Sequence, residues 1–234
     1  MPEPFESTGL LLDRSRKNAF RGTCFAFRHS THFLTAAHCV ERLAANQLGL
    51  SIYLEDQPDN DGLDVLDVVQ HPSADIAVVR VSPWPGELFP PYRGVTTGYR
   101  PGDEFAAFGY PEDTTGQADV APIPRYFRGH FQRFFEYRSP LGYSYLAGEL
   151  SIRTPTGLSG GPVFLPEHPD YVVGVVAENI ESSTHRRTIA NVVNGSSTFS
   201  EVVRSVIDYG ICVMLDEVRE WLDEHIPPVH RKGA

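Results

Sequence analysis

The chain has 234 residues, of which 41% are hydrophobic, and this is enough apolar material for one sizeable core or for two small barrels in tandem. It carries 20 Lys and Arg against 30 Asp and Glu, which gives a formal net charge of −10. An acidic surface repels nucleic acid and anionic membranes, so we expect neither as a partner.

The first twenty residues lack the features of a secretory signal. Their apolar run is only Leu10 to Leu12, and Glu3 and Glu6 stand where a signal peptide carries positive charge. No apolar stretch of the chain approaches the roughly 18 residues that a bilayer-spanning helix needs. We therefore expect a cytoplasmic protein with reduced thiols. A secreted form without its leader is the alternative, which the methionine at position 1 disfavours.

Short strand-like runs, separated by Gly, Pro, Asn and Asp, dominate the chain up to residue 177. In chain order they read GTCFAF, THFLTAA, LSIYL, LDVVQ, DIAVVRV, DEFAAFGY, RYFRGHFQRFFEY, SYLAGELSI, GPVFL and YVVGVVA. Their spacing of about ten residues predicts an all-β barrel or sandwich. The proline-rich stretch 81–103 is interpreted as the linker between two β units.

Helices are predicted only near the C-terminus. Thr198 as N-cap, with Glu201 three residues later and Gly210 as terminator, predicts a helix over 198–209. Asp216 as cap and Pro227 as terminator predict a second helix that packs on the body of the protein. The buried stripe expected for this second helix consists of Val218, Trp221, Leu222 and His225.

Three short segments carry residues suited to nucleophilic catalysis. Ser159 stands among glycines in TPTGLSGGPVF, and a serine hydroxyl becomes a good nucleophile only when an oriented base takes its proton. His38, in TAAHCV, follows an apolar strand that ends in small residues, which would let the imidazole face a cleft. Asp75, in HPSADIAVV, precedes an apolar strand, so its carboxylate should be buried and need a partner such as an imidazole N–H. Taken singly, His38 also fits a structural histidine and Asp75 a turn residue at the start of a strand.

The segments TAAHCV, HPSADIAVV and GLSGGPVF together resemble the signature segments of trypsin-like serine proteases, in the family's order of His, Asp and Ser. GTCFAF, FAAFGYP, VVGVVAEN and a helix after YGICVML are similar to bacterial and intracellular members. The resemblance covers residues 9–226 and implies an all-β fold of two six-stranded antiparallel β-barrels, over 9–95 and 96–212, with a C-terminal helix over 213–226.

The resemblance implies a serine endopeptidase that hydrolyses peptide bonds of a protein or peptide substrate. His38 would act as general base toward Ser159, and Asp75 would hold the imidazole tautomer and stabilise its cation. Glycines around the serine would let the N–H groups of Gly157 and Ser159 converge on an oxyanion hole.

Two features depart from the digestive members of the family. Leu158 stands where those enzymes carry an Asp that pairs with a new N-terminus, and no activation sequence is present, so we expect activity without N-terminal zymogen cleavage. Cys39 follows the histidine as in secreted relatives, but Cys24 falls one residue off the partner position. We expect free, buried thiols there, and at Cys212, although a hairpin one residue shorter would let Cys24 and Cys39 pair. A metal site at these two cysteines and His38 lacks a fourth ligand, so we expect no metal and no cofactor.

The family pattern also places the specificity pocket. Counting back from Ser159 puts Arg153 at its floor, where it would favour an acidic residue at the cleaved position; with different loop lengths it would turn outward to solvent. Ala177, Glu178 and Asn179 would line the wall beside the substrate backbone. A preference for Lys or Arg at the cleaved position is not expected, because no acid occupies the floor, although Glu178 would attract cations from the wall.

A long insertion over 181–209 follows this wall, and its residues His185, Arg186 and Arg187 are interpreted as a solvated basic patch. Because long ordered insertions beside a cleft are often functional, we expect this one to gate the pocket or to dock a regulatory protein partner. The alternative to an active protease is a catalytically silent or partner-gated trypsin-like binding module in a multiprotein signalling or defence system.

Overall fold

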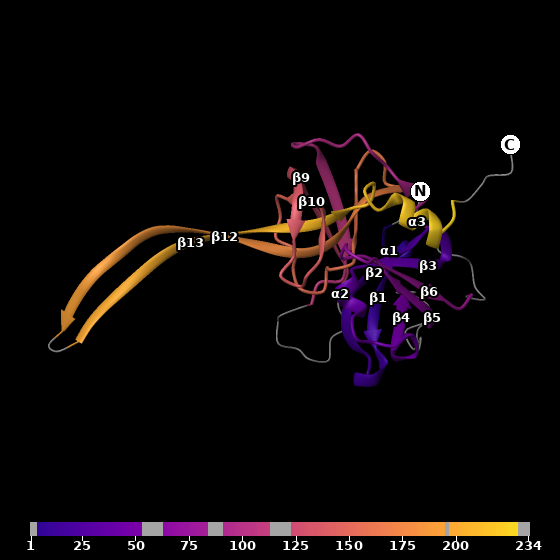
Figure 1. Ribbon diagram of the computed structural model, residues 1–234, viewed down its shortest axis with the longest axis horizontal. Coiled ribbons are helices and arrows are strands. Elements are labelled where there is room, and N and C mark those ends of the chain that lie inside the picture. The colour runs from indigo at the N-terminus through magenta and orange to yellow at the C-terminus, as the bar shows by residue number, and fades with distance from the viewer. Residues whose placement is uncertain (1–3, 53–62, 84–90, 113–122, 195–196, 229–234) are drawn as a thin grey trace.

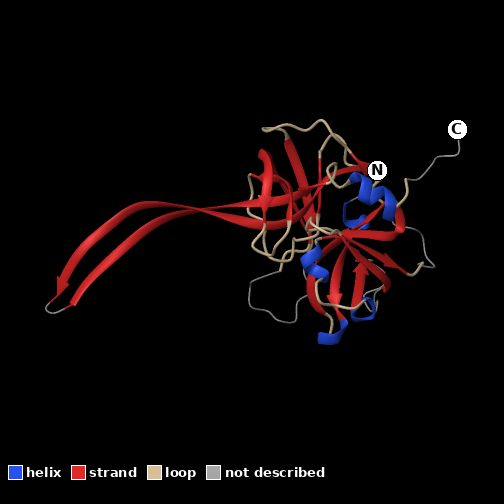
Figure 2. Ribbon diagram, in the orientation of Figure 1, coloured by secondary structure: helices blue, strands red, loops and turns tan. Residues whose placement is uncertain are grey.

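The structure is a computed structural model of the 234-residue chain, and it describes residues 4–52, 63–83, 91–112, 123–194 and 197–228. Strands make up most of these residues, and the few short helices lie at the edges of the fold (Figure 2). The expected all-β fold is confirmed.

Six antiparallel strands form the first barrel, which closes because β1 pairs with both β2 and β4. The strands are β1 (Thr8–Asp13), β2 (Ala19–Phe27), β3 (His29–Thr35), β4 (Leu48–Ile52), β5 (Leu63–Gln70) and β6 (Ala77–Val81). The sequence did not indicate β1, because its apolar run is short and its stability comes from pairing on both edges, with the neighbouring β2 and with the more distant β4.

The second barrel is a circuit of six antiparallel strands, in the order β11-β8-β9-β10-β13-β12, that closes where β11 pairs with β12. The strands are β8 (Glu104–Gly109), β9 (Arg125–Arg138), β10 (Ser144–Leu150), β11 (Pro162–Phe164), β12 (Tyr171–Asn194) and β13 (Ser197–Met214). A two-residue strand, β7 (Gly94–Val95), lies parallel to the start of β12 at the edge of this sheet. The expected pair of six-stranded barrels is therefore present.

Apolar side chains form one cluster inside each barrel and a third cluster between them. The third cluster joins Phe25 and Leu34 of the first barrel to Ala147 and Val175 of the second, and all four are fully buried. Because burial of apolar surface is the main source of stability, this shared cluster holds the two barrels against each other.

The predicted helix over 198–209 is wrong, because these residues belong to β13. Strands β12 and β13 pair from Gly174 and Met214 out to Asn194 and Ser197, and this β12–β13 hairpin projects far from the body of the protein (Figure 1). Valine, isoleucine and phenylalanine in β13 favour a strand, and pairing with β12 outweighs the local capping signal. The Asn-Gly dipeptide at 194–195 was the sequence signal for a hairpin at this point.

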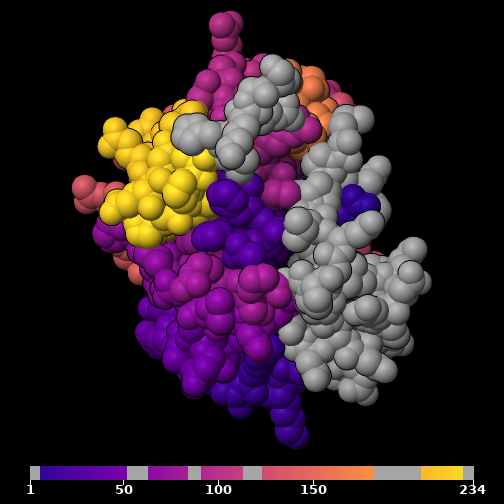
Figure 3. Space-filling view, turned by 90° about the vertical axis from the view of Figure 1, so that its right-hand side faces the viewer, coloured from indigo at the N-terminus to yellow at the C-terminus, as the bar shows by residue number. Residues whose placement is uncertain are grey.

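The predicted C-terminal helix is confirmed as α3 (Arg219–His225). It begins later than expected, because the Asp216 carboxylate accepts a hydrogen bond from the Tyr99 hydroxyl and does not cap the helix. Leu222 is fully buried, and Arg28 of the first barrel donates hydrogen bonds to the Ile226 carbonyl and to Asp223. Helix α3 therefore lies against the first barrel (Figure 3).

The other described helices are single turns: α1 (Pro4–Ser7), α2 (Ala37–Val40) and the 3-10 turns Arg14–Arg16 and Ala45–Gln47. Across the described parts of the chain, every helix is too short or too polar to cross a membrane.

Candidate active site

His38 and Asp75 form a buried pair on the first barrel. The His38 imidazole lies on α2, and its Nδ1 is 2.7 Å from Asp75 Oδ2. The backbone N–H of His38 donates to the other carboxylate oxygen at 2.9 Å. Asp75 is fully buried, whereas 23% of the His38 side chain is exposed. When the neutral imidazole donates its Nδ1 proton to the carboxylate, its Nε2 is left as a proton acceptor.

The environment of His38 stabilises its charged form. Burial of the imidazole acts to lower its pKa, but the hydrogen bond to Asp75, the neighbouring Cys39 thiol and the charge of Asp75 outweigh burial. The pKa of His38 therefore lies well above its usual range. The Asp75 carboxylate therefore stabilises the imidazolium that forms when the ring takes up a second proton.

His71, which the sequence analysis did not single out, shapes the loop that carries Asp75. Its ring Nδ1 accepts the backbone N–H of Ala74 at 2.8 Å, and the backbone N–H of His71 donates to the Ile76 carbonyl at 2.9 Å. Burial, and then the charge of nearby His225, lower the pKa of His71, so the neutral, accepting imidazole is favoured. The loop conformation thus depends on a histidine that makes no contact with the reacting groups.

The loop that carries Ser159 leaves two backbone donors unused. Gly157 and Gly160 have φ angles of 89° and 87°, in the region that favours glycine. The N–H groups of Leu158 and Gly160 donate to the Pro155 and Val176 carbonyls. Within the described chain, the N–H groups of Gly157 and Ser159 have no such acceptor. Two unsatisfied donors two residues apart on a glycine-rich turn suit a developing negative charge.

Thr23 of β2 attaches this loop to the first barrel. Its N–H donates to the Ser159 carbonyl at 2.8 Å, and its hydroxyl donates to the Gly157 carbonyl at 2.8 Å. The same hydroxyl accepts the N–H of Tyr110, and the Thr35 hydroxyl donates to the Thr23 carbonyl. A Cβ at Gly160 would collide with that carbonyl, which explains the glycine. This role could not be predicted from the sequence, because the bonds to Gly157, Ser159 and Tyr110 join segments far apart in the chain.

The Ser159 hydroxyl is directed toward β12. It donates to the Ala177 carbonyl at 2.8 Å, and its single proton is therefore not donated to His38. Ala177 is the extra residue of a β-bulge, because Val176 faces Cys212 while Glu178 faces Ile211. The segments of His38 and Ser159 nevertheless lie in contact, since the thiol of Cys39 is 3.8 Å from the Ser159 carbonyl.

Of the residues expected to surround the substrate, Arg153 and Asn179 are engaged within the protein. The Arg153 side chain is 73% exposed and pairs with Asp208 at 3.2 Å, so it has the outward arrangement rather than lying at a pocket floor. The Asn179 amide accepts the N–H of Thr154 at 2.8 Å and donates to the Thr154 carbonyl. Asn179 thus fixes the loop before Ser159 to β12.

The three cysteines are free and buried. Burial raises the pKa of the Cys24 thiol, and it raises the pKa of Cys212 to about 12, so both stay protonated and unreactive at neutral pH. Among the described residues, no three His, Cys, Asp or Glu side chains are grouped so that they would hold a metal ion.

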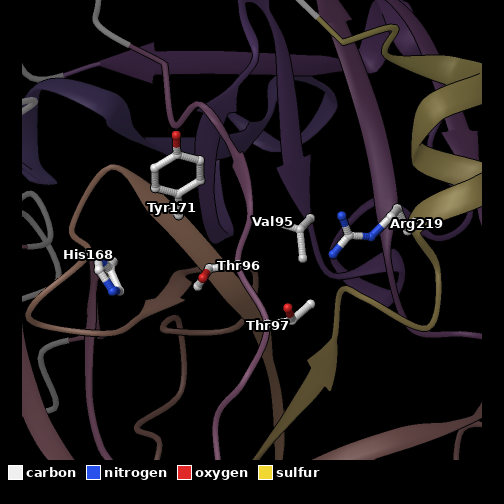
Figure 4. Close-up of a pocket in the computed structure, with 6 residues that line it drawn as sticks. All are labelled: Val95, Thr96, Thr97, His168, Tyr171 and Arg219. Atoms are coloured by element: carbon white, nitrogen blue, oxygen red, sulfur yellow. The ribbon is translucent and has the colours of Figure 1, made fainter.

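A separate hollow of about 300 Å³ lies between β7, the start of β12 and α3 (Figure 4). None of the catalytic residues expected from the sequence lines it. It is lined by Val95, Thr96, Thr97, His168, Tyr171 and Arg219.

Comparison with known proteins identifies the family. The model of the trypsin-like peptidase domain matches residues 22–175, about two thirds of the chain. The chain belongs to this family, and it is a serine protease. None of the curated proteins matches it in sequence.

Solved structures of proteases share its fold. The active form of the Rv3671c protease from M. tuberculosis superposes with a TM-score of 0.62 at 17% identity, covering 98% of this chain and 85% of that one. Neuropsin, a serine protease of mouse brain, gives 0.65 at 14% identity and covers 97% of this chain and 96% of its own. The HtrA-type protease AlgW, solved with a decapeptide, gives 0.59 at 14% identity, covering 89% of this chain and 52% of its own.

We predict that His38 titrates above the usual histidine pKa of about 6.5, which NMR of labelled imidazoles measures directly. In Asp75→Asn the pKa should fall, because the carboxylate that favours the cation is gone. By linkage, the raised pKa of His38 stabilises the fold below about pH 6.5, and this stabilisation is lost as the pH rises through the folded-state pKa. A wild-type pKa at or below 6.5, unchanged in the variant, would contradict this account.

Proposed function

We propose that the protein is a serine endopeptidase in which His38, Asp75 and Ser159 act as a catalytic triad. The observation that carries the proposal is the His38–Asp75 pair, in which Nδ1 faces the buried carboxylate and Nε2 is the ring nitrogen left to take a proton. This pair belongs to the first barrel, and the contact of Cys39 with the Ser159 carbonyl brings the nucleophile's loop beside it. Protein or peptide is the substrate that the family acts on.

In this proposal the reaction begins when the Ser159 hydroxyl leaves the Ala177 carbonyl and turns toward His38. Nε2 takes the hydroxyl proton as the oxygen attacks the scissile carbonyl, and the resulting imidazolium is stabilised by Asp75. His38 then gives the proton to the leaving amine. Water, activated by the same imidazole, releases the acyl group and restores the serine.

The oxyanion formed in the attack is assigned to the N–H groups of Gly157 and Ser159. Both lack an acceptor among the described residues, and the Thr23 hydrogen bonds hold the carbonyls of the same two residues away from the substrate. Each such donor is typically worth about 3 kcal/mol in the transition state.

We predict that a fluorophosphonate probe labels Ser159, and that Ser159→Ala abolishes labelling and lowers peptidase activity by about 10⁴-fold or more. Ser144→Ala, which alters an exposed serine at the start of β10, is the matched control and should be labelled like wild type. Intact-mass spectrometry reads the adduct.

Labelling of Ser144 in place of Ser159, or equal activity of wild type and Ser159→Ala, would refute the triad. Labelling of the wild-type protein in the absence of any other protein would show that no partner is needed to activate Ser159. The gated reading has its own support, because the observed serine rotamer points at Ala177.

A regulatory protein partner, if the site is gated, is assigned to the β12–β13 hairpin. The hairpin continues directly from Ala177 and projects from the body as a two-stranded ribbon (Figure 1). A two-stranded ribbon is marginally stable alone and offers open edges for strand addition. Deleting residues 184–204 should then change the labelling rate of Ser159, and an unchanged rate would remove the hairpin from any gating role.

We also propose that activity does not need N-terminal cleavage. Leu158 is fully buried in the apolar cluster of the second barrel, a position that offers no charge to a new N-terminus. Residues 8–13 are committed to the first barrel as β1, where the Thr8 carbonyl accepts the Tyr110 hydroxyl.

The full-length protein is therefore predicted to cleave peptides at the same rate before and after limited proteolysis of its N-terminal segment. Peptidase assays on the two forms, with cleavage followed by mass spectrometry, measure this. Activity that arises only in the nicked form would show that a released N-terminus is required.

We also propose that the protein is located in the cytoplasm. Three free, buried thiols are consistent with a reducing compartment. Fractionation of cells that express the tagged protein tests this, and recovery outside the cytoplasm would refute it.

A further inference from the structure

Glu178 follows Ala177, whose carbonyl holds the Ser159 hydroxyl. The bulge at Ala177 shifts the register of β12, and Glu178 pairs with Ile211 beyond it. One oxygen of the Glu178 carboxylate, Oε1, is buried and has no hydrogen-bond partner among the described residues. The residue as a whole is half-buried, so part of it reaches the surface of the protein.

Two tyrosines from neighbouring strands surround this carboxylate. The rings of Tyr137 on β9 and Tyr145 on β10 are 5.7 Å apart in an edge-to-face arrangement. The Tyr145 hydroxyl is likewise buried without a partner. Burial, followed by the charge of Glu178 and by the hydrogen bond of Tyr137 to this carboxylate, raises the pKa of Tyr137 to about 12. Oε1 is not the oxygen that accepts this bond.

The arginines near this site are engaged elsewhere. Arg133 on β9 pairs with Glu149 at 2.7 Å, and Arg153 pairs with Asp208 at 3.2 Å. No cation of the described chain forms an ion pair with Glu178. A carboxylate that is partly removed from water without a cation, and with one oxygen unpaired, is costly, and the cost is recovered when a ligand supplies the missing charge.

A guanidinium or ammonium group fits these surroundings best. It would form charge-assisted hydrogen bonds with the carboxylate and would lie against the faces of the two tyrosine rings. The net charge of −10 adds a long-range attraction for cationic chains. A neutral or acidic side chain would leave the charge of Glu178 uncompensated.

We infer that Glu178 is a specificity-determining residue that binds a Lys or Arg side chain of the substrate, at a position close to the cleaved bond. This inference rests on the proposed function, because it takes Ser159 as the nucleophile. The substrates would be basic peptides, recognised by Glu178 on β12 and not by a residue at the floor of the pocket.

Peptide pairs that differ only in arginine against citrulline, its uncharged isostere, test the inference at each position around the cleaved bond. Wild type should cleave the arginine peptide at least about tenfold faster in kcat/KM at one position, the effect of one charge-assisted hydrogen bond. Glu178→Gln keeps the side-chain shape and should reduce the ratio to nearly one. Glu181→Gln removes the same charge from an exposed position on the same strand and should keep the wild-type ratio.

A wild-type ratio near one at every position, or a ratio that survives in Glu178→Gln, would overturn the inference; the second result would be expected if a buried water bridges Glu178 and Tyr145. Fluorophosphonate labelling of Ser159 in the same preparations separates the two proposals. Labelled protein without a charge preference refutes only the role of Glu178, whereas protein that neither reacts with the probe nor cleaves any peptide refutes the proposed function.

Discussion

The hydrogen bonds of Thr23 are the constraint on which the site depends. One buried threonine on the first barrel binds the carbonyls of Ser159 and Gly157 on the second, through its N–H and its hydroxyl. Buried polar groups must be paired, so any sliding of one barrel over the other would break several bonds at once. The position of the nucleophile relative to His38 is thereby fixed by the first barrel itself, on which His38 and Asp75 also lie.

A second consequence concerns the backbone of the loop. The carbonyls that share peptide planes with the Gly157 and Ser159 N–H groups are those of Thr156 and Leu158, and they accept the N–H groups of Glu112 and Gly161. Neither the Gly157 nor the Ser159 N–H has a backbone acceptor among the described residues. The glycines at 157 and 160 permit the positive φ angles of this turn. The Thr23 hydrogen bonds that dock the barrels therefore end on the same turn that carries these two N–H groups.

The sequence was informative where function resides in short, local patterns. The segments around His38, Asp75 and Ser159 combine the reactive residue with small or apolar neighbours, and the strand runs gave the all-β fold. The sequence was misleading at residues 198–209. A capping pattern there predicts a helix, but pairing with β12 makes these residues a strand. The role of Thr23 could not be predicted from the sequence, because its bonds to Gly157 and Ser159 join segments that only the folded chain brings together. His71 makes local bonds, to Ala74 and Ile76, that no recognised motif marks. The outward turn of Arg153 depends likewise on its ion pair with Asp208, which no spacing rule reveals.

The central claim is that His38, Asp75 and Ser159 meet at one point, opposite the N–H groups of Gly157 and Ser159. A crystal structure of the protein after reaction with a peptidyl phosphonate tests it most directly. The account predicts a bond from Ser159 Oγ to phosphorus, with Oγ turned from the Ala177 carbonyl toward His38 and the phosphonyl oxygen accepting both N–H groups. An adduct whose oxygen points away from these donors, or whose phosphorus lies out of reach of the His38 imidazole, would contradict it.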